Sequence, residues 1–354
     1  MSVFNLIRPE LLNAPGYITE TSDTVFRMHA NELPWNPLDS LPLNLNFYPD
    51  DQLQKQLLQK LANRYQVEMN QITLTRGSDE GIDLITRLFL KAGENSLMQF
   101  PPTFSMYEFY TRLQGGKLIQ CPLNAQDNFS LNFAALSAHW RSDCSIIMFC
   151  SPNNPTGNLM DLNLIAAVCK RYASQSIVVV DEAYIEFSAG QSATTLIKEF
   201  ENLIVLRTLS KAAGLAGLRL GCIIAQSSLI SAINKIIPPY ALSSSVIDLG
   251  LQALTNNEWF PAVIKTIQNS RSQLITELKK LPILEKIYDS EGNFILVKTA
   301  YTTQISSWFK KHGIAIKEFS SSSLIPDHLR ITVSDDHRNQ LVIATLTSFM
   351  NNFC

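Results

Sequence analysis

The sequence predicts an α/β protein in which a mainly parallel sheet is flanked by helices. Up to about residue 250, short apolar runs alternate with stretches of helical periodicity, a pattern typical of consecutive βα units. Polar motifs directly follow several apolar runs, and ligands of open α/β sheets gather at the carboxyl ends of strands. The chain has 354 residues, 46% of them hydrophobic and 17% charged, so we expect a large core and two lobes.

The N-terminal segment predicts an irregular arm that leads into a helix. Residues 1–34 are interrupted by prolines, and we expect this arm to join the smaller lobe. Apolar residues between Leu53 and Tyr65 then have helical spacing. We place the larger lobe at residues 35–255.

The motif TRGSDEG at 75–81 lies between an apolar stretch and an amphipathic run, so it predicts a loop that opens a helix. The free backbone N–H groups of Ser78 and Asp79, at the positive end of the helix dipole, would form an anion site suited to a phosphate. The alternative is an ordinary helix start capped by one of these two side chains.

The motif CSPNNPTG at 150–157 follows an apolar strand, and its prolines and terminal glycine predict a rigid turn. Asn154 would direct its side-chain amide toward the ring oxygen of a cofactor, whereas Asn153 would brace the turn. A purely structural turn explains the same residues.

The run IVVVDEAY at 177–184 predicts a buried parallel strand that ends in an acid. A carboxylate from Asp181 at this strand end can keep a pyridine nitrogen protonated, which makes the ring of pyridoxal phosphate an electron sink. Tyr184 could bond the ring hydroxyl. The alternative is an acid that caps the following helix.

The run LRTLSKAAGLAGLRLG at 206–221 follows another apolar strand and places Lys211 among small residues. In an apolar cleft, a lysine amine loses some of its preference for the charged form and can attack an aldehyde to form a Schiff base. Thr208, Ser210 and Arg219 could bind a phosphate beside it. Taken alone, the motif also fits an exposed Ser-Lys pair.

The C-terminal part predicts a smaller α/β lobe at residues 256–354. A long helix over 262–281 would link it to the larger lobe, and 293–297 and 329–333 have the pattern of strands. The polar run SSSS at 320–323 predicts a loop, either a plain surface loop or one that becomes ordered near a ligand.

With these motifs in a consistent order, the sequence resembles the fold-type I pyridoxal-phosphate aminotransferases, and within them the histidinol-phosphate aminotransferase family. The resemblance covers nearly the whole chain. Stretches that are similar to this family include HANELPWNP (29–37), FYPDDQ (47–52), RGSDEGIDLITRLF (76–89), PPTFSMY (101–107), VVDEAYIEF (179–187), SEGNFIL (290–296) and LRITV (329–333).

The resemblance implies a role for each motif in binding pyridoxal 5'-phosphate (PLP). Lys211 would hold the cofactor as an aldimine and then carry a proton between the substrate's α-carbon and the cofactor's C4′. Asp181 would pair with the ring nitrogen, and Asn154 and Tyr184 with the ring oxygen. The cofactor phosphate would be bound by Ser78, Asp79, Thr208, Ser210 and Arg219.

Two aromatic residues complete the implied cofactor site. Phe104 occupies the position of the ring that stacks on the cofactor, where the family usually has a tyrosine. Tyr48 resembles a tyrosine that reaches the cofactor phosphate from the partner subunit, which implies a homodimer.

The resemblance also implies the reaction, amino transfer between L-histidinol phosphate and 2-oxoglutarate in histidine biosynthesis. Arg330 matches the anion clamp of the family and would bind the substrate phosphate in one half-reaction and the α-carboxylate of glutamate in the other. Tyr17 resembles an N-terminal tyrosine that reaches the same anion. Lys317 stands where related enzymes often carry arginine, and Ser334 replaces a common glycine.

Composition and spacing argue against other classes of protein. The net charge is −2 and the basic residues are scattered, so we expect no nucleic-acid binding. There is no apolar run of 18 residues and no leader-like N-terminus, so we expect a cytoplasmic protein without a membrane segment. Histidines and cysteines lack HExxH or CxxC spacing, and the glycines do not form GxGxxG, which argues against a metal site and a dinucleotide site.

Three alternatives to the implied function stay open at this point. The same cofactor could serve an aromatic amino acid aminotransferase, whose substrate carboxylate would use Arg330. It could also serve a decarboxylase of a phosphorylated amino acid. A non-catalytic ligand sensor is the most distant alternative, because such regulators need a DNA-reading module for which the chain has no spare segment, and because Lys211, Asp181 and Arg219 are intact.

Overall fold

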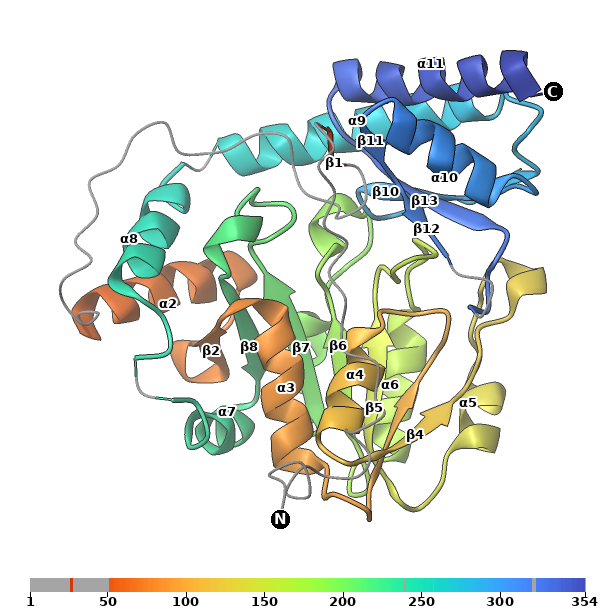
Figure 1. Cartoon of the computed structure of the whole chain (residues 1–354). Helices are drawn as coiled ribbons and strands as arrows, with labels where there is room; N and C mark the ends of the chain where they lie inside the picture. The colour runs from red at the N-terminus through yellow and green to blue at the C-terminus, as the bar shows by residue number, and fades with distance from the viewer. Residues whose placement is uncertain (1–25, 28–50, 239, 257, 320–322, 354) are drawn as a thin grey trace, which may run out of the picture.

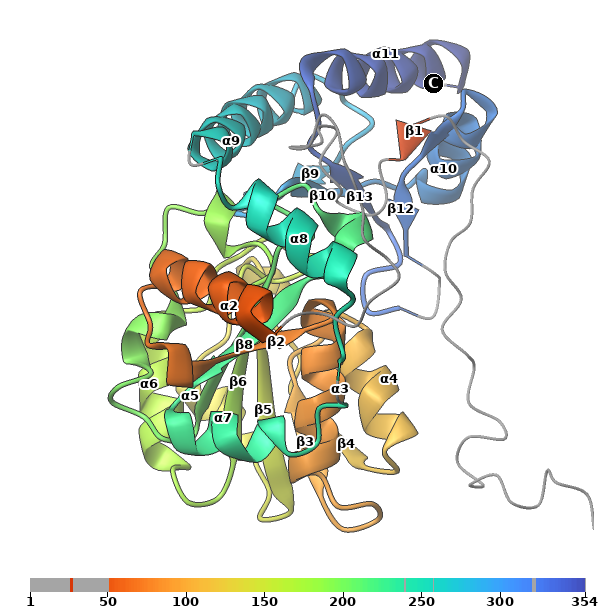
Figure 2. The same ribbon diagram turned by 90° about the vertical axis from the view of Figure 1, so that its left-hand side faces the viewer.

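The computed structural model describes residues 26–27, 51–238, 240–256, 258–319 and 323–353. They form a larger body built on a seven-stranded sheet and a smaller body built on a four-stranded sheet (Figure 1). Figure 2 shows from a second direction that the smaller body lies over one end of the larger one.

The seven-stranded sheet confirms the predicted α/β class. β8 is antiparallel to both of its neighbours, β2 and β7, whereas all pairs from β7 to β4 are parallel. The carboxyl ends of β5, β6 and β7 therefore meet at one edge of the sheet. The strand order is β2 (Ile72–Thr75), β8 (Gly221–Ala225), β7 (Leu203–Thr208), β6 (Ile177–Asp181), β5 (Cys144–Cys150), β3 (Ser96–Gln99) and β4 (Lys117–Gln120).

Helices cover both faces of this sheet (Figure 1). One face packs against α3 (Gly77–Phe89), α4 (Met106–Leu113) and α7 (Ser227–Asn234). The other packs against α2 (Asp51–Tyr65), α5 (Phe133–His139), α6 (Leu162–Arg171) and α8 (Ser244–Ala253). Because both faces are buried, the central strands β5, β6 and β7 are mainly apolar, and their polar residues lie near the strand ends.

Alternation along each strand decides which side chains face which helix layer. On β7, Ile204 and Leu206 pack on the α3 side, whereas Leu203 and Val205 pack on the α2 side. The same alternation on β6 continues to the strand end, with Val179 on the α3 side and Val180 on the α2 side. The next two residues, both acids, therefore point to opposite faces of the sheet.

The smaller body has an antiparallel sheet in the order β12 (Lys317–Glu318), β13 (His328–Thr332), β10 (Phe294–Lys298) and β9 (Lys286–Ile287). Three helices lie on its outer side: α9 (Trp259–Leu278), α10 (Thr302–Lys311) and α11 (Asp336–Phe353) (Figure 1). A short parallel pair joins β1 (Phe26–Arg27) to β11 (Ile314–Ala315). The shorter 3-10 turns are η2 (Met69–Gln71), η3 (Ala125–Asp127), η4 (Ile185–Phe187), η5 (Ala193–Leu196) and η6 (Ala216–Leu218).

The predicted elements are present, with shifted ends. The long helix was expected to end at Leu281, but α9 ends at Leu278. The reason is Pro282, which disfavours helical backbone at the residue before it. The lobe boundaries at 34/35 and 255/256 stay predictions, and most of the arm lies outside the described residues.

Candidate active site

The predicted motifs converge where β5, β6 and β7 end, at the start of α3 and beneath β13 of the smaller body (Figure 1). Cys150 and Asp181 are register partners on neighbouring parallel strands, as are Asp181 and Leu206. The site therefore combines three strand ends of one sheet with one strand of another.

An anion-binding cup lies between the start of α3 and the segment after β7. Arg219 Nη1 donates to Ser210 Oγ at 3.2 Å, and Arg219 Nη2 lies 3.1 Å from Asp79 Oδ2. Thr208 Oγ1 donates to Ser210 Oγ at 2.9 Å and accepts from the Ser210 backbone N–H. Ser78 is in the first turn of α3. Hydroxyl, guanidinium and helix N–H donors thus share one small region, which is the donor set that a phosphate requires.

Two glycines allow this cup to be compact. Gly77 has a φ of +75°, and a Cβ there would lie 2.6 Å from Arg219 Nη2. A Cβ on Gly221 would lie 2.8 Å from the carbonyl carbon of Gly77 and 2.9 Å from the backbone nitrogen of Ser78. Because these contacts at Gly221 are with backbone, the start of α3 can lie against β8 only if this residue is glycine.

Asp181 is a buried carboxylate, 2% exposed, at the end of β6. Its Oδ2 accepts a hydrogen bond from Tyr107 Oη at 2.9 Å, and its Oδ1 accepts one from the Ala183 N–H at 3.1 Å. Burial raises the pKa of Asp181 to about 6, and these two hydrogen bonds act in the opposite direction. Among the described residues, no lysine or arginine forms an ion pair with it.

Lys211, Tyr184 and Asn154 lie next to one another. Lys211 is half-buried, and its Nζ lies 5.7 Å from the centroid of the Tyr184 ring. Asn154 is buried, and its Nδ2 donates to Tyr184 Oη at 3.3 Å. Asn153 instead braces the turn, because its Nδ2 donates to the Pro102 carbonyl and to Thr156 Oγ1. These contacts agree with the bracing role predicted for Asn153, and the role of Asn154 toward a cofactor stays a prediction.

Arg330 extends from β13 of the smaller body into this group. Its Nη1 donates to Asn154 Oδ1, and its guanidinium lies 5.4 Å from the centroid of the Phe294 ring. The Phe294 ring also meets Tyr184 edge-on. Lys317 is the register partner of Arg330 on β12, so the two cationic side chains lie on the same face of the small sheet.

The opposite face of the large sheet carries a second buried acid. Glu182 Oε2 lies 3.2 Å from Arg207 Nη1 and accepts from Ser192 Oγ, and Glu182 Oε1 accepts from the Ala193 N–H. Arg207 also pairs with Glu186 at 2.7 Å and lies over the Tyr65 ring. Arg207 thus supplies the cation for both acids of this cluster, although Glu186 Oε2 and Arg207 Nε have no hydrogen-bond partner among the described residues. None of the predicted site residues belongs to this cluster.

Comparisons with known proteins identify the family. The family model "Aminotransferase class I and II" matches residues 40–346. "Histidinol-phosphate aminotransferase 1" of Legionella pneumophila is 57% identical over 349 residues, which cover 99% of this chain and 96% of that protein. The chain belongs to this family, in its histidinol-phosphate aminotransferase branch.

More distant relatives of this branch also align over nearly the whole chain. The histidinol-phosphate aminotransferase of Francisella philomiragia is 34% identical, with 99% of this chain and 96% of that protein covered. The crystal structure of the Sinorhizobium meliloti histidinol-phosphate aminotransferase in complex with pyridoxal 5'-phosphate has a TM-score of 0.85 at 23% identity. The matched residues cover 94% of this chain and 92% of that chain. This likeness shows that the fold is that of the fold-type I aminotransferases.

For this aminotransferase, the structure decides against several local alternatives. Neither Ser78 nor Asp79 caps α3, because the N-cap is Arg76. Ser210 is buried and Lys211 half-buried, so they are not an exposed Ser-Lys pair. Asp181 bonds a backbone N–H two residues later, and the next 3-10 turn is capped by Tyr184.

Some predicted positions lie outside the described part of this aminotransferase. They are Tyr17, Tyr48 and most of the serine run at 320–323. Their roles stay predictions. Sequence reasoning also left Tyr107 without a role. It stands three residues after Phe104, and its backbone N–H donates to the Phe104 carbonyl in the turn that leads into α4.

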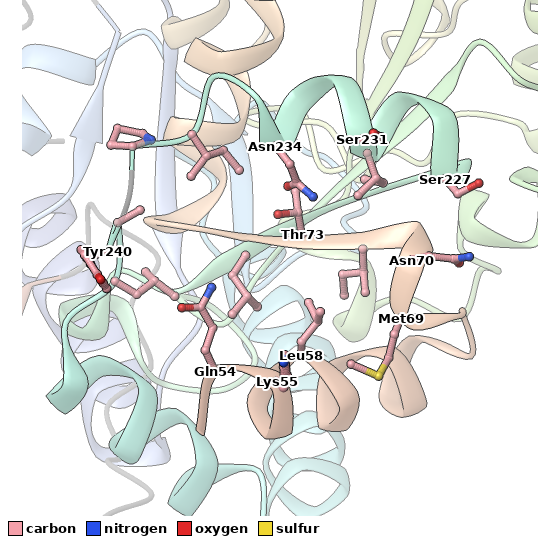
Figure 3. Close-up of a pocket in the computed structure, with 17 residues that line it drawn as sticks. Gln54, Lys55, Leu58, Met69, Asn70, Thr73, Ser227, Ser231, Asn234 and Tyr240 are labelled. Carbon is pink, nitrogen blue, oxygen red and sulfur yellow. The ribbon is translucent and has the colours of Figure 1, made fainter. Parts of the chain in front are cut away.

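A separate groove of about 760 Å³ lies between α2, α7 and the edge strand β2 (Figure 3). Gln54, Lys55 and Asn234 are among the side chains around it, but no predicted site residue lines it. Over the residues that the structure describes, no group of three or more acidic, histidine or cysteine side chains is placed to hold a metal ion. Within that same part of the chain, no helix is long and apolar enough to cross a membrane.

Proposed function

We propose that the chain transfers an amino group from L-histidinol phosphate to 2-oxoglutarate with the help of PLP. The products are 3-(imidazol-4-yl)-2-oxopropyl phosphate and L-glutamate, and the reaction is a step of histidine biosynthesis. The supporting observation is the meeting of a lysine, a buried acid and an anion cup at one sheet edge, in a chain 57% identical to a histidinol-phosphate aminotransferase.

The chemistry of the side chains fits PLP. The cup offers Ser210, Thr208 and Arg219 donors beside the first turn of α3, which suits the dianionic phosphate. Asp181 is a buried carboxylate whose hydrogen bonds come from neutral donors only, so a cationic ring nitrogen would supply the charge that the site needs. Lys211 lies beside Tyr184, within the same group of residues.

Each side chain then has a task in binding or proton transfer. When bound, PLP supplies an aldehyde that accepts the amino group and a ring that withdraws electrons. Lys211 would hold the cofactor through Nζ and move the proton of the substrate's α-carbon as general base and acid. Asp181 would keep the ring nitrogen protonated, while Asn154 and Tyr184 would donate to the ring oxygen and Phe104 would cover the ring face.

Substrate binding is assigned to the smaller body. Arg330 would bind the phosphate of histidinol phosphate in one half-reaction and the α-carboxylate of glutamate in the other, because a planar guanidinium suits both anions. Lys317, on the same face of the small sheet, would add a point charge. Tyr17 would donate to the same anion.

A homodimer is part of this proposal, with Tyr48 of one subunit completing the phosphate cup of the other. The support is the openness of the cup in a single chain, where the side chains of Arg219 and Asp79 are 48% and 39% exposed. The test is a mixed dimer of Tyr48→Ala and Lys211→Ala subunits. If Tyr48 acts across the interface, this dimer contains one intact site and regains activity that neither variant has alone. If Tyr48 acts within its own subunit, nothing is regained.

We also place the enzyme in the cytoplasm. The support is that Cys121, Cys144, Cys150, Cys169 and Cys222 are all free thiols. Cell fractionation with an antibody against the chain tests this location.

The reaction itself is tested by steady-state kinetics with PLP-loaded enzyme. L-histidinol phosphate is compared with L-phenylalanine and L-tyrosine as amino donor, with 2-oxoglutarate as acceptor and glutamate formation as the readout. We expect kcat/KM for histidinol phosphate to be at least about 100-fold higher, roughly 3 kcal/mol in transition-state binding. Equal or higher kcat/KM values for the aromatic amino acids would still show an aminotransferase, but they would reject histidinol phosphate as its substrate. Because histidinol phosphate has no carboxylate, the decarboxylase alternative is tested with a phosphorylated amino acid, O-phospho-L-threonine, in a separate assay. Release of carbon dioxide from it without formation of glutamate would indicate a decarboxylase.

A further inference from the structure

Tyr107 reaches the candidate site from a helix that carries none of the predicted site residues. It lies in the first turn of α4, is fully buried, and donates its phenolic hydrogen to Asp181 Oδ2 at 2.9 Å. Its backbone carbonyl accepts from Thr111 Oγ1. The two partners are 74 residues apart in sequence, so this bond ties α4 to the end of β6.

Tyr107 is a permanent donor to Asp181. Burial and the nearby Asp181 carboxylate raise the pKa of Tyr107 well above its ordinary value, so the phenol keeps its proton. While Asp181 is ionised, the Tyr107 hydroxyl is therefore always the donor and the carboxylate always the acceptor. A bond of this kind to a charged acceptor is stronger than a neutral one.

The other groups around Asp181 oppose its ionisation. After burial, the remaining contributions that raise its pKa come from Asp79 on α3 and from the adjacent Glu182. Cys150, on the neighbouring strand, is a buried thiol whose pKa is raised to about 12, so it is neutral. The donors that favour the carboxylate are Tyr107 and the Ala183 N–H. Of these, only Tyr107 can be removed by changing one side chain.

The same ring also supports the residue assigned to the cofactor face. Phe104 and Tyr107 meet edge-on, with ring centroids 5.6 Å apart and an interplanar angle of 84°. One side chain thus contacts both the candidate stacking ring and the candidate acid.

We propose that Tyr107 is a positioning residue of the aminotransferase, which holds Asp181 ionised and fixed in rotation for the cofactor's ring nitrogen and supports Phe104 from the side. This inference rests on the proposed function of the site. Removing the hydroxyl leaves the carboxylate with one donor, so the carboxyl takes up a proton more readily and holds a cationic ring less tightly.

The test is the PLP affinity of the apoenzyme, measured by fluorescence titration between pH 5 and 8, for wild type and Tyr107→Phe. The matched control is Tyr172→Phe, which removes the hydroxyl of another buried tyrosine that donates to Ser137 Oγ. We expect Tyr107→Phe to raise the PLP dissociation constant at pH 7 by about 10- to 100-fold, the range for a hydrogen bond to a charged group. We also expect the pH midpoint of binding to rise, and kcat to fall more than KM changes. The control should leave all three values unchanged.

A double-mutant cycle separates this role from a merely structural one. In an Asp181→Asn background, Tyr107→Phe should have little further effect on PLP affinity, because the charged acceptor is already gone. Should Tyr107→Phe not fold, 3-fluorotyrosine placed at 107 gives a stronger donor, and the pH midpoint should fall.

The outcomes distinguish this inference from the proposed function. Wild-type apoenzyme that does not bind PLP would overturn the proposed function itself. Wild-type binding with an unchanged affinity and midpoint in Tyr107→Phe would overturn the role of Tyr107 alone. Effects that are fully additive in the cycle would also overturn it.

Discussion

Asp181 and Glu182 are consecutive buried acids, and the two faces of the large sheet give them opposite surroundings. Glu182 faces the α2 side, where Arg207 pairs with it and Ser192 donates to it. Asp181 faces the α3 side, where its donors are the neutral Tyr107 hydroxyl and a backbone N–H. A buried acid that already has its cation is part of the structure, whereas one held by neutral donors can accept a cationic ligand.

The comparison extends to the residues around each acid. On the Asp181 side lie Lys211 and the anion cup, which together suit a phosphorylated aromatic aldehyde. On the Glu182 side, Arg207 bridges Glu182 and Glu186 and lies over the Tyr65 ring. Changes on the first face should therefore alter catalysis with little effect on folding, and changes on the second face should do the reverse.

The largest expected effect is on the catalytic face. Lys211→Ala should lower kcat by about 10³- to 10⁴-fold, because both the covalent attachment and the proton transfer are lost. Borohydride reduction of the loaded wild type, followed by peptide mass spectrometry, should find the cofactor mass on Lys211. The control is the exposed Lys235→Ala. If the cofactor mass is found on another lysine, Lys211 is not the residue that holds the cofactor.

The matching change on the structural face is Arg207→Leu. It leaves Glu182 and Glu186 buried without their cation, so we expect a loss of about 3 to 5 kcal/mol in the free energy of unfolding. Urea denaturation measures this loss. The exposed Arg141→Leu, which removes a surface pair with Asp143, should cost about 1 kcal/mol or less. A drop in kcat of the folded Arg207→Leu enzyme that exceeds its stability loss would contradict the division between the faces.

A substitution in the smaller body tests whether Arg330 binds both substrates. Arg330→Ala should raise KM for both histidinol phosphate and glutamate, because each loses a charge-assisted pair worth about 1.5 to 3 kcal/mol. Lys298→Ala is the control, since Lys298 lies on β10 of the same sheet and pairs with Glu285, the residue before β9. An effect on only one of the two substrates would reject the shared clamp.

A smaller effect follows from pH. The pKa of Asp181 is about 6 in the apoprotein, so it is ionised at pH 7 and neutral below about pH 5. PLP affinity should therefore decrease by up to about tenfold per pH unit as the pH falls below 6. The free energy of unfolding of the apoprotein should change in the opposite direction. An acid whose pKa is raised in the folded state binds a proton more tightly there than in the unfolded state, so the apoprotein becomes more stable as the pH falls through 6. In the Asp181→Asn variant, neither PLP affinity nor the free energy of unfolding should change in this way with pH. If either pH dependence persists, a titrating group other than Asp181 causes it.

Short-range patterns were sufficient to predict much of this architecture. Apolar runs such as Leu203–Leu206 are buried on both faces and therefore lack alternation, which is why they were predictable as central strands. Lys211, Asp181 and Asn154 could be predicted as neighbours because each ends or follows such a run, and parallel strands bring their carboxyl ends together.

Contacts that depend on three-dimensional packing were not predictable. Tyr107 meets Asp181 across 74 residues, and Arg207 meets Glu182 across 25, with no spacing rule that links either pair. The sequence around Gly221 does not indicate that its backbone lies against Gly77 and Ser78, which is the contact that requires a glycine at this position. The apolar periodicity continues to Leu281, but α9 ends at Leu278 because Pro282 disfavours helical backbone before it.

The most direct measurement compares Asp181→Asn and Glu182→Gln in parallel, with PLP affinity and urea denaturation recorded for each. We predict that Asp181→Asn weakens PLP binding by at least about 100-fold and leaves the free energy of unfolding of the apoprotein unchanged or higher. Glu182→Gln should lower that free energy by about 1 to 3 kcal/mol and leave PLP affinity unchanged. Weakened PLP binding in Glu182→Gln together with unchanged binding in Asp181→Asn would contradict the division of the two faces.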